Sequence, residues 1–577
     1  MQRIKLEIKI NLLTPLHIGG EPGEDTNTKY ILRGADGRAY YPGTAFKGKT
    51  RHYARMLQKD VCKLSEECDC SVCRLFGGVG NARSSLFFSD FHANGENATD
   101  IRAGNKIDRY RRVAEDEKLF TTESAAIREM VGAITGKVED NEELNLLKDS
   151  IRLIQQIGGN TSRGFGWVDG EIAINEVEIE QQDEEPADSE TGTASSVSIV
   201  ITPTSPLLIG THTTQSNFRD TQFVIPGAVL RAALARAICE LDGTNDPSTD
   251  GIKGVLPEDR ETSFTNLRKS FSELRFSVLN PKRVKTKNPD TFIEQTEPYP
   301  ITTRKCKYDK GHEKVDILAM LLSQSWKNGE IREVCPKCSG RLEKVGPYED
   351  IIERMFTITS THSEMDRWRG TSQDKRLYTV RAISQETAVF QGTISGDIDM
   401  KELSILLKSP LHIGAMTTTG FGECEATFEQ VAETQANDMI DRINRFNEKV
   451  GDADTLVPIT LMSDAIVNLE EPKDQGDYKD SYKSIVDGLD IECVITKPRI
   501  WRGFETSKKQ CKEKEPQYLL QAGSVIVIRV GELTDSVIDK LMRFEREGIG
   551  EETKDGYGAV RVAHENHTTL AIEGEPI

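Results

Sequence analysis

Long apolar runs are missing from this sequence of 577 residues, and basic residues are in the minority. No apolar run approaches the ~18 residues that a membrane-spanning helix requires, so an integral membrane protein is excluded. The first eight residues alternate charged and apolar side chains, whereas a signal peptide needs a continuous apolar core. We therefore expect a cytoplasmic protein of several globular domains with no membrane partner.

The shortage of basic charge argues at first against a nucleic-acid-binding protein. Lys and Arg number 74 against 93 Asp and Glu, a net charge of -19, and attraction to phosphate is the first requirement of such binding. The charge is unevenly distributed, however. Residues 33–83 contain ten Lys or Arg and five acids, whereas residues 176–190 contain eight acids and no base. We interpret the acidic stretch as a solvated linker.

Three copies of one glycine pattern indicate an internal repeat, and repeats decide the architecture before any single motif is interpreted. The pattern Ile-Gly-x5-Gly-aromatic-Gly occurs at 157–166, 413–422 and 549–558. Each copy precedes a short alternating apolar segment, as a glycine turn entering a strand does. A second pattern, Asp-Arg-aromatic-Arg, occurs at 108–111 and again at 366–369. The sequence therefore predicts three related units.

The first two units also open in the same way. Apolar residues alternate over 4–12 and over 197–201, which indicates a strand, and each unit then reaches a Pro-Gly pair that starts a helix, at Pro42 and Pro226. Strands and helices in this order predict an α+β fold of tandem ferredoxin-like (RRM-like) modules with zinc-binding insertions. The expected parts are a first module at 1–180, an acidic linker at 181–196, a second module at 197–430 with a zinc-ribbon-like insertion, a third and smaller module at 450–565, and a tail at 566–577.

The motifs in this order resemble those of the RAMP proteins (repeat-associated mysterious proteins) of type III CRISPR-Cas effector complexes. The resemblance rests on Pro-Leu-His-Ile-Gly at 15–19, Pro-Gly-x3-Lys-Gly at 42–48, Ile-Asp-Arg at 107–109 and the three glycine turns. The first unit is similar to the backbone subunit that polymerises along the guide RNA, and residues 195–577 are similar to the larger RAMP subunit of type III-D complexes. The resemblance implies a fused subunit that binds crRNA, lets target RNA pair with it in antiviral defence, and assembles with other type III CRISPR-Cas subunits.

Three features are expected to contact RNA. A glycine turn brings backbone N–H groups close to a phosphate, the helix after Pro42 carries basic residues four apart on one face, and the Asp-Arg-aromatic-Arg segments offer planar groups on which bases can stack. The resemblance implies that these segments form a projecting hairpin that kinks the guide. Turns that only allow packing, a solvated helix face and local ion pairs are the structural alternatives. The candidate RNA-binding residues are Lys47, Lys49, Arg51, Arg55, Arg109, Arg111, Gly158, Gly159, Arg163, Gly164 and Gly166 in the first unit, and Arg231, Arg367, Arg369, Gly414, Gly420, Gly422, Gly550, Gly556 and Gly558 in the later units.

Two groups of potential metal ligands are present. Thiolate and imidazole groups at this density favour tetrahedral zinc in a reducing cytoplasm, and four-ligand sites are structural. The spacing of Cys68 and Cys70 is irregular for a single ion, so His52 is an alternative ligand there, and buried free cysteines are the alternative to both sites. The predicted zinc ligands are Cys62, Cys68, Cys70 and Cys73 in the first site and Cys306, His312, Cys335 and Cys338 in the second.

Catalysis has one candidate residue. The resemblance implies that subunits that cut target RNA carry an aspartate in the loop before the Pro-Gly helix, and Asn27 stands at that position here. An amide cannot act as a base, so cleavage of RNA by this chain would require Asp25.

A P-loop NTPase is the alternative function, because residues 43–50 match G-x4-G-K-T. A P-loop follows a long buried strand, however, and only the short extended segment 39–41 precedes this helix. The equivalent start of the second helix has Ala232 and Ala233 in place of the Gly-Lys pair. The sequence therefore favours an RNA-binding and chiefly architectural protein.

Overall fold

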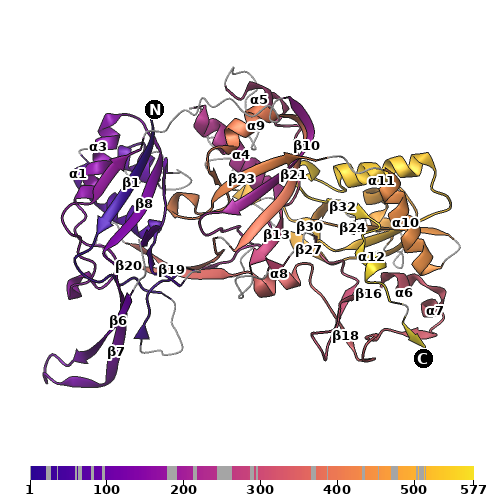
Figure 1. Ribbon diagram of the computed structural model, residues 1–577, viewed down its shortest axis with the longest axis horizontal. Helices are drawn as coiled ribbons and strands as arrows, with labels where there is room; N and C mark the ends of the chain where they lie inside the picture. The colour runs from indigo at the N-terminus through magenta and orange to yellow at the C-terminus, as the bar shows by residue number, and fades with distance from the viewer. Residues whose placement is uncertain are drawn as a thin grey trace.

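Three sheets with their covering helices lie side by side along the chain (Figure 1). We call the parts built on these sheets the first, second and third modules. None of the described helices is both long and apolar enough to cross a membrane. The computed structural model describes all residues except 1, 21–27, 35–36, 59–61, 63–67, 79–83, 94–97, 178–191, 212–216, 243–262, 286–291, 294–296, 366–371, 386, 432–435, 452–453, 469–478, 502–503, 506–511, 514, 573 and 577.

The first module begins with the central strand of its sheet, in which every second residue from Ile4 to Ile10 is buried. This alternation gives the sheet one apolar face, against which two amphipathic helices pack. The second of these helices starts where the Asp140 carboxylate accepts the amide of Glu143. The elements of the module are β1 (Gln2–Asn11), β2 (Thr28–Lys29), β3 (Tyr40–Tyr41), α1 (Gly43–Leu57), α2 (Ser71–Phe76), β4 (Leu86–Phe88), β5 (Phe91–Ala93), β6 (Ala98–Ile107), β7 (Ala114–Ala126), β8 (Glu129–Val138), α3 (Asn141–Arg152), η1 (Thr161–Arg163) and β9 (Ala173–Glu176).

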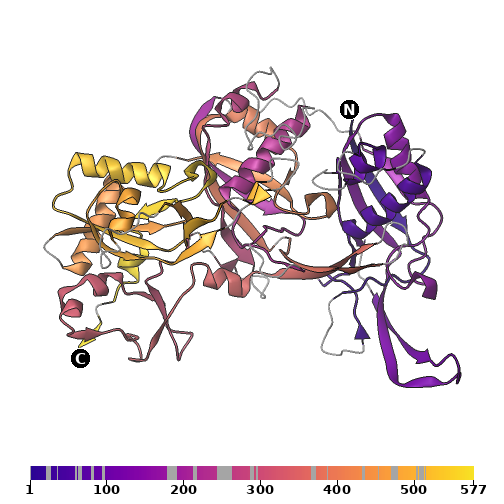
Figure 2. The same cartoon turned by 180° about the vertical axis from the view of Figure 1, so that it is seen from behind.

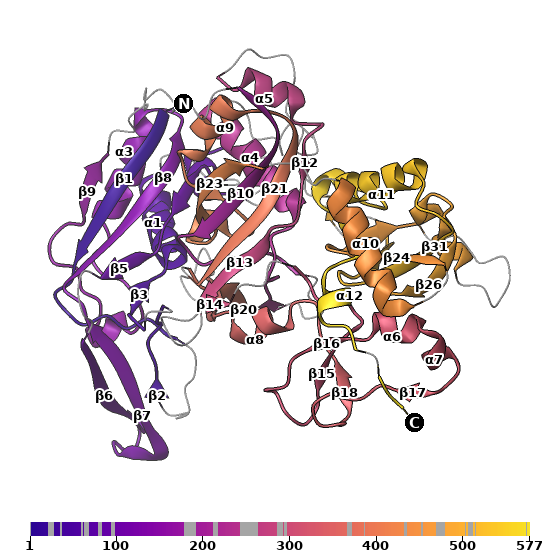
Figure 3. The ribbon, with the colours of Figure 1, turned by 45° about the vertical axis from the view of Figure 1, so that its right-hand side comes forward.

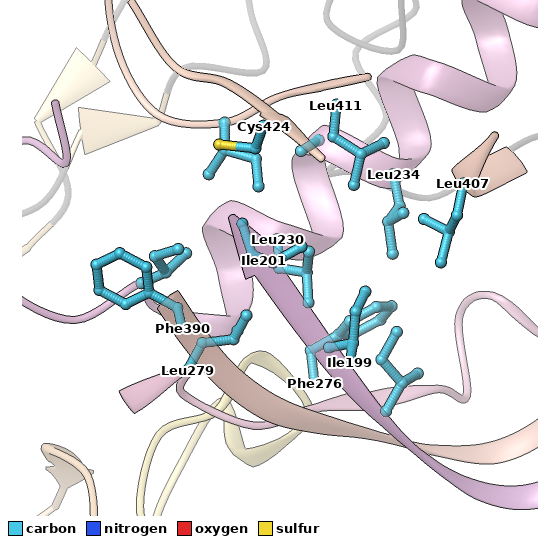
Figure 4. Packing of buried hydrophobic residues seen from close by; sticks show 14 of the residues in the cluster. Ile199, Ile201, Leu230, Leu234, Phe276, Leu279, Phe390, Leu407, Leu411 and Cys424 are labelled. Atoms are coloured by element: carbon cyan, nitrogen blue, oxygen red, sulfur yellow. The ribbon is translucent and has the colours of Figure 1, made fainter. Parts of the chain in front are cut away.

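The second module repeats this plan and contains a large apolar core. Figure 4 shows Leu230 and Leu234 of its first helix beside Ile201 of the central strand, with Phe390 at the edge of the same cluster. Its elements are β10 (Thr193–Pro203), β11 (Phe218–Arg219), α4 (Gly227–Leu241), α5 (Thr265–Ser270), β12 (Arg275–Phe276), β13 (Asn280–Lys285), β14 (Phe292–Ile293), α8 (Glu349–Arg354), β19 (Thr357–Met365), β20 (Ser372–Ile383), β21 (Ala388–Asp399), α9 (Met400–Leu407), β22 (Leu411–His412), η3 (Thr417–Thr419) and β23 (Glu423–Gln430).

The third module is built on a four-stranded sheet and is bounded by helices on both sides in sequence. Its core includes Met439 and Ile443 of the helix that precedes the sheet, so the module extends beyond the predicted limits of 450–565. Its elements are α10 (Ala436–Val450), β24 (Thr455–Leu461), β25 (Ala465–Val467), η4 (Asp480–Val486), β26 (Ile491–Ile495), β27 (Pro498–Trp501), β28 (Phe504–Glu505), β29 (Lys512–Glu513), β30 (Gln517–Leu520), β31 (Val525–Val530), α11 (Asp535–Glu547), η5 (Thr553–Asp555), β32 (Val560–Val562), α12 (Asn566–Thr569) and β33 (Glu575–Pro576).

An insertion between β14 and α8 belongs to the second module in sequence but packs on the third. Figure 3 shows its helices α6 and α7 beneath the third sheet, close to α12. Leu318 and Leu322 of α6 share a core with Phe446 of α10, and the Asp316 carboxylate pairs with Nδ1 of the buried His567 at 3.0 Å. The elements of the insertion are β15 (Thr303–Cys306), β16 (Val315–Asp316), α6 (Leu318–Leu322), α7 (Gln324–Lys327), β17 (Ile331–Arg332) and β18 (Leu342–Lys344).

The four central strands have the same antiparallel order in all three modules. The orders are β5-β8-β1-β9, β13-β21-β10-β23 and β26-β31-β24-β32, so that in each module the second strand in sequence is followed by the third, the first and the fourth. The molecule is thus a mixed α+β protein with a repeated sheet. The predicted acidic linker at 181–196 falls largely outside the described residues, and the predicted domain limits at that point stay predictions.

Candidate nucleic-acid interface and metal centres

The three glycine turns share one backbone conformation. Gly164, Gly420 and Gly556 have φ angles of 89°, 92° and 87°, in the left-handed region that favours glycine. Each turn is closed by a hydrogen bond from the amide of its isoleucine to the carbonyl of its last glycine, at 2.7 to 2.9 Å. A Cβ on that last glycine would lie 1.8 to 2.0 Å from the isoleucine carbonyl oxygen. The repeat in the sequence is therefore a repeat of structure.

Several of the glycine amides expected to face a phosphate are used inside the first turn. The amide of Gly159 donates to the His17 carbonyl at 2.7 Å, that of Gly164 to the Thr161 carbonyl at 3.1 Å, and that of Gly166 to a carbonyl of the strand-opening segment at 3.0 Å. An amide that already donates has no second proton for an anion. At these positions the glycines therefore allow a tightly packed turn, which is the structural alternative offered by the sequence.

The second and third turns each contact the preceding module. A Cβ on Gly420 would lie 2.5 Å from Oδ1 of Asp90 in the first module, and a Cβ on Gly556 would lie 2.6 Å from the carbonyl oxygen of Phe276 in the second. A Cβ on Gly164 would meet no other atom within 4 Å among the described residues. Gly420 and Gly556 are accordingly buried, whereas Gly164 is exposed.

A basic side chain completes each of these two junctions. Nζ of Lys47 on α1 donates to the carbonyl oxygen of Thr418 at 3.1 Å, and Nη2 of Arg231 on α4 donates to that of Lys554 at 3.2 Å. Both side chains were expected on an RNA-binding face, and both are instead buried between modules. Burial, assisted by the neighbouring charge of Arg51, lowers the pKa of Lys47 to about 7.

The two basic side chains also share their surroundings. Each stands five residues after the proline that precedes its helix and lies over a phenylalanine ring, with the cation 5.6 Å from the ring centroid in the first module and 5.0 Å in the second. These rings belong to a Leu-x-Phe-Ser segment found at 86–89 and 274–277. We define the acceptor surface of the first module as Gly43, Lys47, Phe88 and Asp90, and that of the second as Gly227, Arg231 and Phe276.

The remaining basic residues of α1 lie on a partly buried face. Nη2 of Arg51 donates to the Gly77 carbonyl at 2.7 Å, Nζ of Lys49 lies 6.0 Å from the ring centroid of Tyr53, and Arg55 is half-buried. The contact of these side chains with RNA stays a prediction.

Residues 43–50 form the first part of α1 rather than a loop. The helix begins at Gly43, directly after the two-residue strand β3, and the Gly43 amide donates to Oδ1 of Asp90 at 2.7 Å. A P-loop lies before its helix and cradles phosphate with its own amides. The structure therefore does not support the alternative of a P-loop NTPase.

The first Asp-Arg-aromatic-Arg segment lies at the tip of a long hairpin, formed by β6 and β7, that projects from the first module away from the other two (Figures 1 and 2). The Asp108 carboxylate accepts the amides of Tyr110 and Arg111 at 2.8 and 3.0 Å and so fixes the tip. Tyr110 is 98% exposed, with Arg109 and Arg111 exposed beside it. The segment thus forms the projecting hairpin that was predicted, and its contact with RNA stays a prediction.

At the base of this hairpin, three basic side chains surround two phenylalanine rings. Arg102 of β6 lies 4.9 Å from the ring centroid of Phe165 in the glycine turn, and Lys29 and Arg163 each lie 5.3 Å from that of Phe120. All three basic side chains are exposed. We call these five residues the first cation–aromatic cluster. Sequence reasoning had found Arg163 alone among them.

The second module has a matching group at the base of the β19–β20 hairpin. Arg219 lies 5.0 Å from the ring centroid of Tyr378, and His362 stacks on Tyr378 at 5.3 Å and lies 6.4 Å from Phe421 of the second glycine turn. Burial lowers the pKa of His362, and the charge of Arg219 acts in the same direction. We call these four residues the second cation–aromatic cluster. Its two rings hold the same places, on the hairpin and in the glycine turn, as the two rings of the first cluster.

A comparison with protein-family models finds a match to the RAMP superfamily over residues 9–169 and 200–425, which is more than half of the chain. The chain belongs to the RAMP superfamily. The matched regions of this RAMP chain contain the first two glycine turns and both cation–aromatic clusters, whereas the third glycine turn lies outside them. A search of curated proteins found no match.

Four cysteines of the RAMP chain converge next to α2. Sγ of Cys62 lies 3.8 Å from Sγ of Cys68 and 3.5 Å from Sγ of Cys73, and with Cys70 all four sulfur atoms lie within 4.8 Å of one another. Four thiolates bound at about 2.3 Å to a tetrahedral zinc ion would be about 3.8 Å apart. All four predicted ligands therefore suit one ion, and the alternative ligand His52 is not part of the group.

The second ligand set lies in the insertion. Sγ of Cys306 on β15 lies 3.6 Å from Sγ of Cys338, and Nδ1 of His312 lies 3.4 Å from Sγ of Cys335. The four ligand atoms are again within 4.8 Å of one another, so this set could also hold a metal ion. Oδ2 of Asp309 lies 3.4 Å from Nε2 of His312, the place of the carboxylate that commonly orients a metal-binding histidine.

Three predicted site residues lie outside the described part of the chain. They are Asp25, the catalytic candidate, and Arg367 and Arg369 at the tip of the β19–β20 hairpin. Their roles stay predictions.

Proposed function

We propose that this RAMP chain is a crRNA-binding and chiefly architectural subunit of a type III CRISPR-Cas effector complex, in which it holds guide RNA for recognition of target RNA in antiviral defence. The observation that carries the proposal is the cation–aromatic cluster between hairpin and glycine turn, which recurs at matching positions in two modules. Membership of the RAMP superfamily supports it, because the resemblance in sequence implies the same role.

The chemistry of the clusters suits single-stranded RNA. Aromatic rings and guanidinium planes stack on unpaired bases, at about 1–3 kcal/mol per base, and exposed cations attract the phosphates. With a net charge of -19, the chain must concentrate its attraction for RNA in local groups of this kind. Groups that contact base faces and phosphates do not read base edges. Sequence selection would then rest on pairing between guide and target.

The tip of the β6–β7 hairpin has a second role in the proposal. Tyr110 offers an aromatic ring that is almost fully exposed, between Arg109 and Arg111. A ring in this position can enter the base stack while the arginines contact the flanking phosphates. We assign the tip to a kink in the guide RNA.

We further propose that the three modules are ferredoxin-like and that both ligand sets hold structural zinc. The shared strand order supports the first statement, because a βαββαβ arrangement has this order when its strands are antiparallel. Cysteine and histidine donors in sets of four support the second. Zinc held by four protein ligands cross-links the chain and keeps no open position for catalysis.

Recovery of RNA tests the main proposal. The full chain purified from its host should carry small RNAs derived from CRISPR repeats, identified by sequencing. Recovery of no RNA, or of RNA in proportion to its cellular abundance, would contradict the proposal.

Variants of the first cluster make the test specific to the site. Phe120→Ala and Arg163→Ala should each weaken binding of the recovered RNA by about tenfold to a hundredfold, which corresponds to the loss of about 1–3 kcal/mol of stacking. Arg152→Ala is the matched control, because this exposed arginine on α3 pairs with Asp149, belongs to neither cluster, and should leave binding unchanged. Equal effects of all three substitutions would assign the binding to general charge.

Cleavage of target RNA by the first module is a separate proposal that rests on Asp25. The purified complex should cut a matched target RNA, and Asp25→Ala should abolish cutting while guide RNA stays bound. Unchanged cutting would remove this residue as the base.

A further inference from the structure

The glycine turns outnumber the surfaces that receive them. The chain has three turns of the same conformation and two acceptor surfaces, and residues 450–565 contain no Pro-Gly pair that could start a third. The acceptor surface of the first module holds the second turn, and that of the second module holds the third turn. The first turn, residues 157–166, is thus built like the other two but occupies neither acceptor surface of its own chain.

The contact atoms of the first turn are accessible. Gly164 is exposed, with a φ of 89° that matches its two buried equivalents, and Ser162 is exposed at the position whose carbonyl receives the basic side chain in both internal junctions. A left-handed glycine is needed in the other turns because a Cβ there would strike the preceding module. The same glycine in the first turn meets nothing in the described chain, so a neighbour outside it would account for the requirement.

Two apolar side chains beside the first turn point to the same surface. Leu13 donates its amide to the Trp167 carbonyl at 2.8 Å, as Thr204 does to Glu423 at 2.9 Å in the second module, so the two pairs are structural equivalents. Thr204 and Glu423 line a cleft of about 570 Å³ between the first and second modules. Leu13 and Trp167 are 63% and 41% exposed. Large apolar residues at the place of a module junction indicate a surface that a protein partner covers.

The two hairpins agree with this direction. Figures 1 and 2 both show β19–β20 reaching from the second module towards the first, whereas β6–β7 reaches from the first module away from the rest of the chain. A subunit placed before the first module would meet its hairpin as the first module meets that of the second.

We propose that the first glycine turn, with Leu13 and Trp167, docks onto the acceptor surface of a separate RAMP protein. That surface would consist of a helix that starts after Pro-Gly, a lysine or arginine five residues beyond the proline, and a strand with the sequence Leu-x-Phe-Ser. The basic side chain would donate to the Ser162 carbonyl. A second copy of this chain is not the partner, because both of its acceptor surfaces are filled by its own turns.

A site-specific cross-link tests the proposal in the full chain. A photo-cross-linking residue in place of Ser162, in the complex assembled in the host, should react with another polypeptide within a few residues of the basic residue that follows a Pro-Gly helix start. The same residue in place of Thr418 is the control and should react within the chain, close to Lys47. Cross-links from position 162 only to RNA, only to this chain, or to no protein would overturn the proposal.

Two further measurements complete the test. The isolated chain should have the mass of one polypeptide, 64.4 kDa, at all concentrations, and larger species abolished by Gly164→Trp would assign the turn to a second copy instead. Gly164→Trp and Trp167→Glu should each lower the yield of the cross-link at least tenfold while the isolated chain keeps its thermal unfolding midpoint. An unchanged yield in Trp167→Glu, which places at this site the residue type of the second module, would contradict the docking surface.

The inference rests on the proposed function only in placing the chain within a larger RNA–protein complex. RNA recovered without the expected cross-link would overturn the docking proposal alone. The expected cross-link without bound RNA would overturn the proposed function and leave the docking surface in place.

Discussion

The three left-handed glycines allow the module junctions to be tested by a matched set of substitutions. Gly164, Gly420 and Gly556 have nearly the same φ, so alanine at each should cost the same backbone strain, about 1–2 kcal/mol. They differ in what the added Cβ would meet. We expect Gly164→Ala to cost only the backbone strain, and the other two substitutions to cost more.

The additional cost follows from the surroundings of the added methyl group. At Gly420 it would lie 2.5 Å from Oδ1 of Asp90, which is held by the Gly43 amide at 2.7 Å and cannot move without losing that hydrogen bond. At Gly556 it would meet the backbone carbonyl of Phe276 at 2.6 Å. Overpacking of this kind costs about 1–3 kcal/mol. The free energy of unfolding should therefore fall by about 2–5 kcal/mol for Gly420→Ala and Gly556→Ala.

Unfolding in urea measures the magnitude, and hydrogen–deuterium exchange locates it. Gly420→Ala should increase exchange at the start of α1 and in η3, on the two sides of the first junction, whereas Gly164→Ala should leave exchange in α1 unchanged. Equal losses of stability in all three variants, within about 0.5 kcal/mol, would refute the reasoning. The turns would then act alone, without contributing to the junctions.

Three other predictions concern titration and metal. Burial raises the pKa of Asp90 to about 7, opposed by the hydrogen bond from the backbone amide of Gly43, so its contribution to stability is complete below pH ~4 and is lost as the pH rises towards 7; Asp90→Asn should remove this decline, measured by urea unfolding at pH 5 and pH 8. Burial, with the charge of Arg236, lowers the pKa of His412 to about 4, so stability should be lost as the pH falls from 6.5 towards 4, and His412→Gln showing the same acid loss as the wild-type chain would contradict this assignment. Metal analysis should find two zinc ions per chain and one in Cys335→Ser, and fewer than about one in the wild-type chain would exclude both sites.

The repeats could be predicted from the sequence because their residues obey a backbone constraint. Only glycine adopts a left-handed φ readily, so the turn at 157–166 keeps its glycine spacing wherever it occurs. The tip of the β6–β7 hairpin was found for a similar reason, since the Asp108 carboxylate must stand two and three residues before the amides it accepts. The four-cysteine group was found despite its irregular spacing, because thiols at such density have few other uses.

The positions of Lys47 and Arg231 could not be predicted from the sequence. Basic residues four apart on a helix have the same pattern whether they face phosphates or the carbonyl of a neighbouring module. Only the contact with Thr418, 371 positions away, distinguishes the two. The exposed cations of the first cation–aromatic cluster were missed because Lys29, Arg102 and Phe120 are far apart in sequence. The repeated Lys/Arg-Leu-aromatic-Thr segment at 118–121 and 376–379 was the one available signal.

The insertion has a consequence for attempts to divide the chain. It leaves the second module between β14 and α8, yet Leu318 and Leu322 lie in a core of the third module, and its Asp316 is buried against His567. A protease cut between β23 and α10 would therefore not release two separate pieces. A gene truncated at the same point would encode an insertion with its apolar face in water and a carboxylate without its histidine. Fragments for expression should end before the second module or retain everything that follows it.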